Sequence, residues 1–539
     1  MDETGIFKSL IISANDPLNW AQWRRDVMLI VIGFHSLVGG GQTPILAAGF
    51  RTVSEQFNVP LTKVSYTTGA YMFALGIGSV IAGPLAEIYG KRPVYLAGQI
   101  IFCAACIWAA LSPSYPSLLA ARIVEGFGVS PVECLPSSSI AEIFFLHERA
   151  FRLGIYTMLL LGGKNLVPLV SAAVIQTCGW RWVFGIVAII VAMNFVLTFV
   201  FVSETSWDRN VVPAVLEKSE LPSLSANVDA TPFSISDDGS TRPSVGENYA
   251  GDSVPTIESS QDHMSQPHAL RIPTSQRIDA KEESQPEYTV ASWKQRLAVS
   301  NGRLSSVPFW KIALRPFVLF AYPAILFSTI VYSLSVVWLI VMSESLSQIF
   351  QANPYNFSSL SIGLIYISPL IGGILGSSVA GKLSDILVKS MAHRNNGIYE
   401  PEFRLVLAIP VALVTALGLI GFGWSAYVKD PWIAPTVFFG CISFGCSLGS
   451  TMSISFVVDS YRIHAQEALV TLNFTKNTLG FIFSLWFNDA LTADGSRTIF
   501  IILGAVQIFV CLFALPLYIY GKRCRSWTHR SGMIDWLYR

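Results

Sequence analysis

Long apolar stretches recur along the whole chain, and their length limits what the chain can fold into. A helix of about 20 apolar residues crosses the hydrocarbon core of a bilayer. Helices are required there because lipid offers backbone N–H and C=O groups no partner outside the segment. The pattern predicts an all-α membrane protein with 12 transmembrane helices in two groups of six. We place the spans at residues 27–49, 66–86, 93–112, 117–141, 153–177, 182–203, 317–342, 359–381, 404–426, 432–457, 466–488 and 498–520.

The composition excludes other classes of protein. Of the 539 residues, 52% are hydrophobic and 13% are charged, whereas a soluble domain carries about 25% charged residues. The net charge of +1 gives no electrostatic footprint for nucleic acid. Cys103 and Cys106 form a C-x-x-C inside an apolar run with no second pair nearby. We therefore interpret them as apolar filler, with metal or redox chemistry as the alternative.

A segment of different composition divides the chain. Residues 204–310 are rich in Ser, Pro, Asp, Glu and Gln, which predicts a disordered linker because such a segment buries too little apolar surface to order itself. It separates an N-terminal bundle (27–203) from a C-terminal bundle (311–520), with tails at 1–26 and 521–539. We identify no cleavable signal peptide in the first tail, so the first apolar run is expected to direct membrane targeting.

The placement of Lys and Arg predicts the orientation in the membrane. With both tails and the linker in the cytoplasm, the outside loops carry few basic residues, among them Arg51, Lys63, Lys429 and Arg497. The sequon at Asn356 then lies in an outside loop, where a glycan can be attached, whereas the sequon at Asn473 lies within a span.

An internal repeat relates the two groups of spans. The stretch GSVIAGPLAE (78–87) aligns with GSSVAGKLSD (376–385), and each stretch ends the second span of its half. Half of the aligned positions are identical, and the acid Glu87 aligns with the acid Asp385. Repeats of six spans are typical of secondary transporters, in which two bundles rock about a central site.

Four motifs carry a resemblance to a known family. GPLAEIYGKRPVYL (83–96) is similar to the loop signature G-x-L-x-D-R-x-G-R-R of the major facilitator superfamily, with Glu87 in place of the usual Asp. RIVEGFGVSP (122–131) resembles its fourth-helix motif R-x-x-x-G. SETSWDR (203–209) resembles the P-E-T-x-x-x-R ending of fungal members. RNNGIYEPEFRL (394–405) resembles a segment of fungal drug:proton antiporter-like 12-span transporters, in the branch with cation and polyamine carriers.

The resemblance implies the major facilitator fold and a gating motif that latches one conformer. We expect Glu87 to meet a basic side chain or the positive N-terminal end of a neighbouring helix. Lys91 and Arg92 are expected to anchor the loop at the lipid headgroups, or only to set topology. The gating residues are Gly83, Glu87, Gly90, Lys91, Arg92, Gly381 and Asp385.

Span five departs from the family pattern. The resemblance places a glycine-rich G-P-x-x-G-G there in drug antiporters, but this chain reads GGKNLVPLVSAA (162–173), which keeps Pro168 and loses the glycines after it. Because the resemblance ties that motif to exporters, the direction of transport stays open.

Charged and polar residues within the spans are the candidate transport residues. A charge at mid-helix costs about 2.5–3.5 kcal/mol on insertion scales, so we expect pairs or contact with water. At 100° per residue, Arg122, Glu125 and Glu133 share one broad face of span four. Glu133 is expected to pair with Lys164 of span five. The remaining substrate-cavity candidates are Gln42, Asn165, Asn473, Lys476 and Asn477, the last three of which form one stripe.

Proton coupling requires a group that changes its protonation state as access alternates. Glu125 and Glu133 are the candidates, with Arg122 or Lys164 as the partner that is released. His35 is a further candidate because imidazole titrates near neutral pH. The alternatives are a purely structural Arg122–Glu125 pair, a structural Glu133 pair, and a histidine that only packs between helices.

Other chemistries lack their motifs. The sequence contains no ATP-binding P-loop, no H-E-x-x-H, and no G-x-S-x-G at a membrane face, so we expect neither an enzyme nor a cofactor or metal. The predicted function is proton-coupled efflux of a fungal secondary metabolite or drug-like compound. The alternatives are proton-coupled uptake of a small organic cation or nutrient, and a nutrient sensor that has kept the carrier fold.

The charges counted within the spans also bear on the substrate. Glu125 and Glu133 are matched by Arg122, Lys164 and Lys476, which disfavours a polyamine and predicts a neutral or anionic organic molecule. The expected partners are this substrate, protons and the lipid bilayer, with no nucleic acid, and the carrier is expected to work as a monomer. We predict a plasma-membrane location, with the vacuolar membrane as the alternative.

Overall fold

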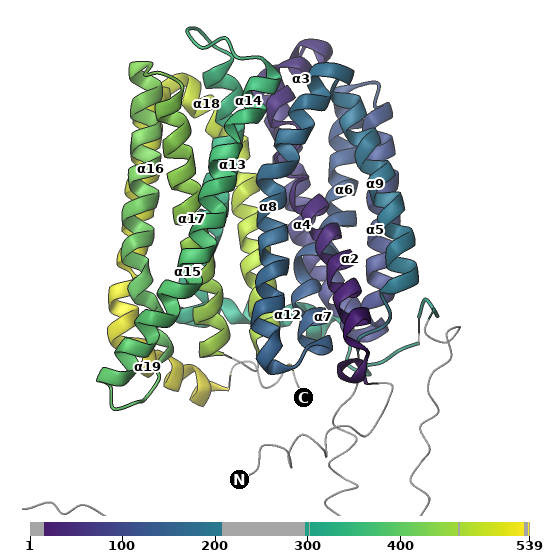
Figure 1. Cartoon of the computed structure of the whole chain (residues 1–539), viewed down its shortest axis with the longest axis vertical. Coiled ribbons are helices and arrows are strands. Elements are labelled where there is room, and N and C mark those ends of the chain that lie inside the picture. The colour runs from purple at the N-terminus through teal and green to yellow at the C-terminus, as the bar shows by residue number, and fades with distance from the viewer. Residues whose placement is uncertain (1–15, 207–296, 301, 462–463, 533–536, 538–539) are drawn as a thin grey trace, which may run out of the picture. The chain divides into compact units, whose positions relative to one another are not determined.

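The structure is a computed structural model that describes residues 16–206, 297–300, 302–461, 464–532 and 537. Residues 207–296 of the predicted linker and residues 1–15 of the predicted N-terminal tail lie outside the described residues. The described residues form helices and no strands, as the sequence predicts (Figure 1).

The N-terminal half supplies six long helices. Their bounds agree with the first six predicted spans to within seven residues, except that the first span continues past α2 as turns and a short helix at Ala47–Gly49. The short helix α3 follows at Phe50–Phe57, and α7 extends α6 at Pro136–Ile143. The long helices are α2 (Gln22–Gly40), α4 (Leu61–Tyr89), α5 (Lys91–Leu111), α6 (Tyr115–Cys134), α8 (Leu146–Cys178) and α9 (Trp180–Phe201).

The C-terminal half repeats this arrangement after a short helix, α12 (Phe309–Val318). A turn of 3-10 helix at Pro401–Leu407 precedes α16, and α18 covers two predicted spans because it bends at Gly495, whose φ is 79°. The helices are α13 (Pro323–Phe350), α14 (Ser359–Ile365), α15 (Ile367–Arg394), α16 (Ala408–Val428), α17 (Ile433–Ser460), α18 (Ala465–Leu512) and α19 (Ala514–Ser531).

Hydropathy confirms that these helices suit a bilayer. Nine segments of the described chain are long and apolar enough to cross a membrane, and the last of them, Ala465–Ser531, holds two predicted spans. The two remaining predicted spans correspond to α2, which carries Arg24, Arg25 and Asp26, and α6, which carries Arg122, Glu125 and Glu133.

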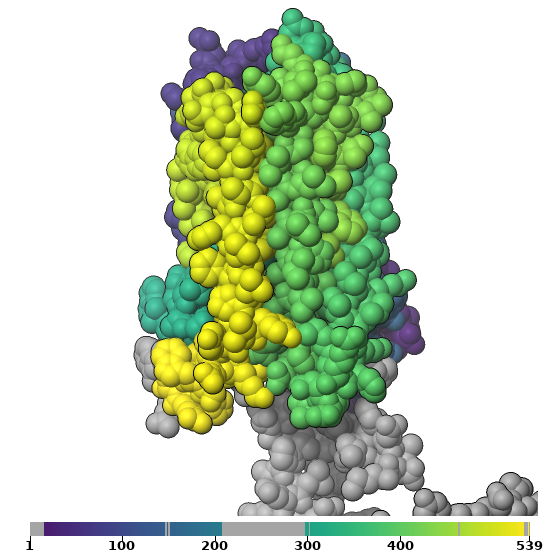
Figure 2. Space-filling view, turned by 90° about the vertical axis from the view of Figure 1, so that its left-hand side faces the viewer, coloured from purple at the N-terminus to yellow at the C-terminus, as the bar shows by residue number. Residues whose placement is uncertain are grey.

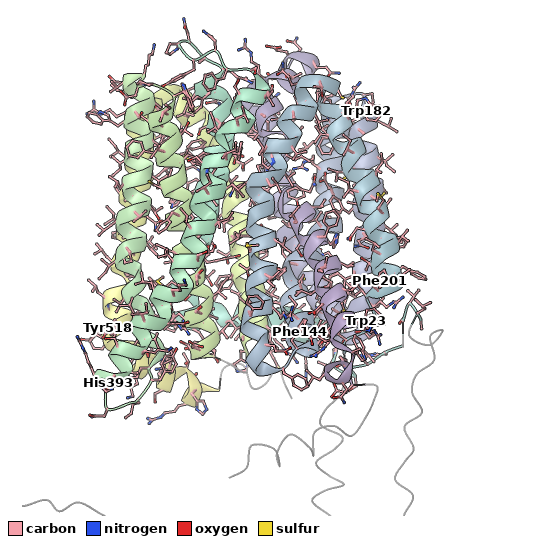
Figure 3. All side chains as sticks on the ribbon, in the orientation of Figure 1. Trp23, Phe144, Trp182, Phe201, His393 and Tyr518 are labelled. Atoms are coloured by element: carbon pink, nitrogen blue, oxygen red, sulfur yellow. The ribbon has the colours of Figure 1, made fainter. Side chains whose placement is uncertain are left out.

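The helices run side by side between two ends, which we name by their short helices (Figure 1). The α3 end carries α3, α14 and the loop at 351–358. The α12 end carries α7, α12 and α19. The exposed aromatic side chains Trp182 near the α3 end, and Trp23 and Tyr518 near the α12 end (Figure 3), are placed as in the aromatic belts of membrane proteins.

The outer surface of the helices is apolar. Ile189, Leu413 and Leu417 are 58%, 64% and 63% exposed, and such side chains are stable in lipid rather than in water. Figure 2 shows one such face, where the C-terminal part of α18 and α19 lies beside α15 to α17.

The two halves pack against each other within one compact unit, mainly where α4 lies along α18. Glycines allow this approach: a Cβ on Gly69 would lie 2.9 Å from Cβ of Ser484, and one on Gly76 would lie 3.1 Å from Cβ of Asn477. Small residues serve this purpose in membrane helix packing because they let the backbones come close. A second contact joins α8 to α14 and α15.

Two segments outside the predicted bundles are ordered against them. The C-terminal tail, predicted from 521, continues as helix α19, where Arg525 binds Glu402 at 2.7 Å and Lys522 binds Glu400 at 2.8 Å. The last part of the predicted linker contacts the N-terminal half, since the Leu304 N–H donates to the Ile88 carbonyl at 2.7 Å.

Candidate functional site

An ion pair is buried inside the N-terminal half, on α6. Nη1 of Arg122 lies 3.0 Å from both carboxylate oxygens of Glu125, and the two side chains are 1% and 0% exposed. Nη2 of Arg122 donates to the Gln42 carbonyl at 2.8 Å, and the Tyr71 ring lies 4.3 Å from the guanidinium carbon. All of these groups belong to α4, α6 and the turn after α2, so this pair ties together elements of one half.

A second ion pair joins the two halves. Nζ of Lys476 on α18 lies 2.6 Å from Oε1 of Glu133 on α6. Nδ2 of Asn477 donates to Oε2 of Glu133 at 2.9 Å, and Nδ2 of Asn473 donates to the Glu133 carbonyl at 3.1 Å. Tyr332 of α13 donates to Asn473 at 3.4 Å. The predicted stripe on span eleven therefore acts as one unit, and its partner is Glu133.

The predicted Glu133–Lys164 pair is wrong as a direct contact. Lys164 is buried close enough to Glu133 and Lys476 to interact with their charges, but it makes no hydrogen bond or ion pair with a described residue. The carboxylate is instead occupied by Lys476 and Asn477, because α18 of the other half packs across α6 at this level. Helical periodicity within one half does not reveal which helix of the other half lies opposite.

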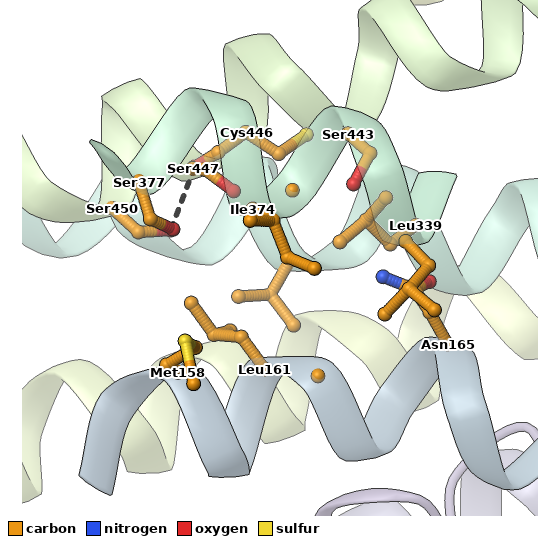
Figure 4. A pocket seen from close by; sticks show the side chains of 14 residues that line it. Met158, Leu161, Asn165, Leu339, Ile374, Ser377, Ser443, Cys446, Ser447 and Ser450 are labelled. Carbon is orange, nitrogen blue, oxygen red and sulfur yellow. Dashed lines mark hydrogen bonds between the residues drawn. The ribbon is translucent and has the colours of Figure 1, made fainter. Parts of the chain in front are cut away.

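A pocket lies next to this network, between α8 of one half and α13, α15 and α17 of the other (Figure 4). It has about 30 Å³ of free volume, which holds a few waters at most. Asn165, Ser443 and Ser447 supply polar groups, and Leu161 and Ile374 supply apolar surface. No charged side chain is among the described residues that line it.

Asn165 makes a direct contact across the pocket. Its Nδ2 donates to the Pro369 carbonyl of α15 at 3.3 Å, and the hydroxyl of Ser443 on α17 donates to the same carbonyl at 2.7 Å. A substrate larger than a few waters therefore requires α8 to separate from α15. Lys164, the neighbouring residue in the chain, does not line the pocket.

His35 and Gln42 do not join the pocket or the interhalf ion pair. His35 is 3% exposed, and its ring centroid lies 6.2 Å from that of Phe102. Its Nδ1 has no hydrogen-bond partner among the described residues. Nε2 of Gln42 donates to the Val38 carbonyl one turn earlier at 3.2 Å. Both residues therefore lie in the packing of the N-terminal half.

Glu87 of the loop motif binds a basic side chain. Oε1 of Glu87 lies 3.1 Å from Nη1 of Arg315 on α12, and Arg315 lies 3.7 Å from Glu467 at the start of α18. A Cβ on Gly83 would lie 4.0 Å from Val470 of α18. The three charges link α4 of one half to α18 of the other at the α12 end, through a short helix that precedes the predicted seventh span.

The basic residues that follow Glu87 are buried, which corrects their assignment to the lipid headgroups. Lys91 binds Glu142 at 2.6 Å, and Nη2 of Arg92 donates to the Phe199 carbonyl at 2.8 Å. Their backbone N–H groups donate to the carboxylate of Glu204 at 3.1 and 3.0 Å. Glu204 thus caps the first turn of α5, where the helix dipole favours an anion. Gly90 has φ of 94°, which leads the chain into this turn.

The second half does not repeat this arrangement. A Cβ on Gly381 would meet nothing within 4 Å, and Asp385 is exposed. Arg404 instead binds Asp459 at 2.5 Å and the Ser384 hydroxyl at 2.7 Å. The two copies of the repeat therefore have different surroundings in this conformation.

One buried acid was missed by the sequence reading. Glu344 on α13 is 1% exposed and accepts hydrogen bonds from Ser484 at 2.6 Å and Asn488 at 3.3 Å, both on α18. The predicted span ended at residue 342, whereas α13 runs to Phe350. The run of serines on both sides of Glu344 resembles a loop in composition. With Glu344, the acids buried within the long helices number three, as many as Arg122, Lys164 and Lys476.

Two helical halves of equal design, an ion pair buried between them and a pocket at their interface define a secondary transporter of the two-bundle kind. The chain belongs to the Major Facilitator Superfamily, whose profile matches residues 28–485. It is therefore a membrane transporter and not an enzyme.

Curated relatives extend over nearly the whole chain. Protein HOL1 of Saccharomyces cerevisiae is 27% identical, with 96% of this chain and 89% of that protein covered. The MFS antiporter QDR3 of Candida albicans is 24% identical, with 94% and 79% covered. The MFS transporter cpaT of Aspergillus oryzae is 24% identical, with 94% and 89% covered.

Solved structures share the fold. The xylose transporter XylE from E. coli, in a partially occluded inward-open conformation, superposes with a TM-score of 0.57 over 91% of this chain and 99% of that chain, at 13% identity. A D-xylose-proton symporter gives the same TM-score at 14% identity, with 91% and 97% covered.

Proposed function

We propose that the protein is a proton-coupled carrier that exports a small, uncharged organic compound, such as a fungal secondary metabolite or a drug-like molecule, by alternating access. The observation that supports this most is the pocket between α8 and α15. It combines an amide and several hydroxyls with apolar side chains, and its described lining carries no charge. Such a lining suits a neutral molecule with a few hydrogen-bonding groups.

The buried charges support the same substrate class. Arg122 and Lys476 are each paired with an acid at 3.0 and 2.6 Å, so these cations are already satisfied within the protein. An anionic substrate would have to compete with those acids. The contact from Asn165 to Pro369 closes the pocket in this conformation, and its breakage would open a path between the halves.

The segment 394–405, which resembles drug:proton antiporter-like transporters, and the relative named as an antiporter favour export over uptake. Uptake of a small organic cation is the second candidate, and one observation favours it. The carboxylate of Glu344 has no cationic partner among the described residues, and an organic cation could supply one.

We also propose the membrane and the orientation. The α12 end faces the cytoplasm, since the basic residues gather there and leave few in the loops at the α3 end. Asn356, exposed in the loop at 351–358, then lies outside and accepts a glycan. The proposed location is the plasma membrane, and the proposed functional unit is the monomer.

Metabolite profiling of a strain that lacks the gene tests the function. Export predicts that one compound or a small family accumulates inside the cells and is depleted from the medium, and that the intact gene reverses both changes. Depletion inside the cells would instead support uptake. Equal profiles inside and outside under all growth conditions would contradict transport of a metabolite.

A pair of variants tests the pocket. Ser377→Ala removes a hydroxyl from the pocket lining, whereas Ser378→Ala removes one from the exposed side of the same helix. Only the first is expected to change the apparent affinity for the exported compound. Equal effects of both variants would place the substrate elsewhere.

A further inference from the structure

Glu344 lies near the α3 end of α13, outside the networks that involve Arg122 and Glu133. Both of its carboxylate oxygens are engaged by α18: Oε1 accepts from the Ser484 hydroxyl at 2.6 Å, and Oε2 accepts from the Asn488 amide at 3.3 Å. Nε2 of Gln348 donates to Oδ1 of Asn488 at 3.0 Å, which fixes the orientation of that amide. The side chain is 1% exposed.

The other two acids buried within the long helices differ from Glu344 in one respect. Glu125 and Glu133 each have a basic group within 3.0 Å, whereas Glu344 contacts only neutral donors among the described residues. A buried carboxylate without a cation carries the full cost of an isolated charge in a site shielded from water. A proton removes that cost, and the Ser484 hydroxyl can then accept a hydrogen bond in place of donating one.

The burial of Glu344 depends on contact between the halves. The Ser65 hydroxyl of α4 donates to the Ser484 carbonyl at 3.3 Å. One turn further along α4, a Cβ on Gly69 would lie 2.9 Å from Cβ of Ser484. The helix that covers the carboxylate is thus itself covered by a helix of the other half. Separation of α4 from α18 at the α3 end would admit water to Glu344.

We propose that Glu344 is the residue that carries the coupled proton, bound while α4 packs against α18 at the α3 end and exchanged with the outside solution when these helices separate. This inference rests on the proposed proton-coupled transport. It removes the proton-carrying role from the ion-paired Glu125 and Glu133, which hold their helices together in this conformation.

Among the residues that the structure describes, few other titratable groups face this site. Tyr366, between α14 and α15, is buried and close enough to interact with the charge of Glu344. Lys63 on α4 and Asp489 on α18 belong to the covering helices but are exposed. Tyr366 is neutral throughout the physiological range, so Glu344 is the group of this set whose protonation changes on opening.

Infrared spectroscopy tests the assignment without any transported compound. The full chain is reconstituted in vesicles of phosphatidylcholine and phosphatidylglycerol, and spectra are recorded as the pH is raised. A protonated carboxyl group has a carbonyl stretching band that a carboxylate lacks. We expect one such band at neutral pH, where surface carboxyls are ionised, and we expect Glu344→Gln to lose it.

Asp489→Asn is the matched control, since it removes a neighbouring but exposed acid of α18, and it is expected to keep the band. Gly69→Trp, which holds α4 away from α18, is expected to lose the band at neutral pH while Glu344 is still present. Retention of the band in Glu344→Gln, in a variant with wild-type helicity and elution volume, would overturn the assignment. Retention of the band in Gly69→Trp would show that protonation of Glu344 does not depend on the contact between α4 and α18.

Complementation of the gene-deletion strain distinguishes this inference from the proposed function. The gene-deletion strain shows whether a compound is exported, and this result does not depend on Glu344. In that strain, Asp489→Asn is expected to restore export and Glu344→Gln to restore none, at equal protein levels. Full restoration by Glu344→Gln would overturn the inference and leave the export function intact.

Discussion

Glu133 and Lys476 form an ion pair at 2.6 Å, although they lie in different halves of the chain and are separated by more than the whole predicted linker. The pair is nearly inaccessible to water, with side chains 6% and 2% exposed. A transporter that opens between these halves has to break or move this contact. It is therefore a contact of one conformation and not only of the fold.

The first prediction concerns the cost of breaking that pair. Glu133→Gln leaves Lys476 buried without its anion and beside Lys164, and loss of one partner of a buried pair typically destabilises by about 3–5 kcal/mol. The double variant Glu133→Gln/Lys476→Met is expected to lose less stability than the sum of the single variants. Thermal unfolding in detergent measures both effects. The exposed pair Arg51–Glu55 is the control. If the stability losses of the single Glu133 and Lys476 variants add up in the double variant, the result contradicts direct coupling of these two residues.

The second prediction concerns the bridge at the α12 end. Glu87 is 37% exposed, so its pair with Arg315 contributes about 1 kcal/mol or less to folding. A change of that size still alters a two-state population by roughly fivefold. Arg315→Ala is expected to open this end and to speed labelling of Ser450→Cys in the pocket by a thiol reagent. Lys389→Ala, an exposed base at the same end, is expected to leave the labelling rate unchanged. A slower rate in Arg315→Ala would contradict the bridge.

The third prediction concerns the cap of α5. The carboxylate of Glu204 accepts from four backbone N–H groups, those of residues 91, 92, 205 and 206. Glu204→Ala is expected to reduce the free energy of unfolding by about 1–2 kcal/mol, since a cap and a favourable dipole contact are both lost. Glu204→Gln keeps one acceptor oxygen, so its free energy of unfolding should lie between those of the wild type and Glu204→Ala. Equal melting temperatures for the three proteins would show that water replaces the cap.

The fourth prediction concerns glycosylation. Asn356 is exposed, whereas Asn473 is held at the interface by its bond to the Glu133 carbonyl. Asn356→Gln is expected to abolish a glycosidase-sensitive shift in gel mobility when the protein is expressed in a fungal host. Asn473→Gln is expected to keep the shift. A shift that survives Asn356→Gln would show that the glycan is attached elsewhere and would leave the outside position of this loop unsupported.

The helices and the family were predictable because they depend on short-range pattern. Each span needs only enough apolar residues to cross lipid, and the loop motif at 83–96 is contiguous in the sequence. The polar stripe of Asn473, Lys476 and Asn477 was found for the same reason, since helical periodicity places these residues on one face.

Partners across the interface were not predictable. Lys164 and Lys476 are both mid-span bases, and nothing in the local sequence states which one faces Glu133. Arg315 was missed because it lies in α12, a helix of ten residues that is too short to span. Glu344 was missed because its serine neighbours resemble a loop in composition, although their hydroxyls bond to carbonyls within the helix, as the Ser345 hydroxyl does to the Met342 carbonyl. Hydropathy does not register such contacts.

The ordered end of the connection between the halves has a practical consequence. Nη2 of Arg92 donates to the Leu297 carbonyl at 3.1 Å, and the Leu304 N–H donates to the Ile88 carbonyl at 2.7 Å. From residue 297 onward the chain is thus fastened to the N-terminal half, and about ten residues separate Leu304 from Arg315. Tags or deletions placed before residue 297 should leave the contacts of Arg315 with Glu87 and Glu467 unchanged. An insertion of a few residues between Leu304 and Arg315 would instead lengthen this connection. Arg315 would then shift away from Glu87 and Glu467.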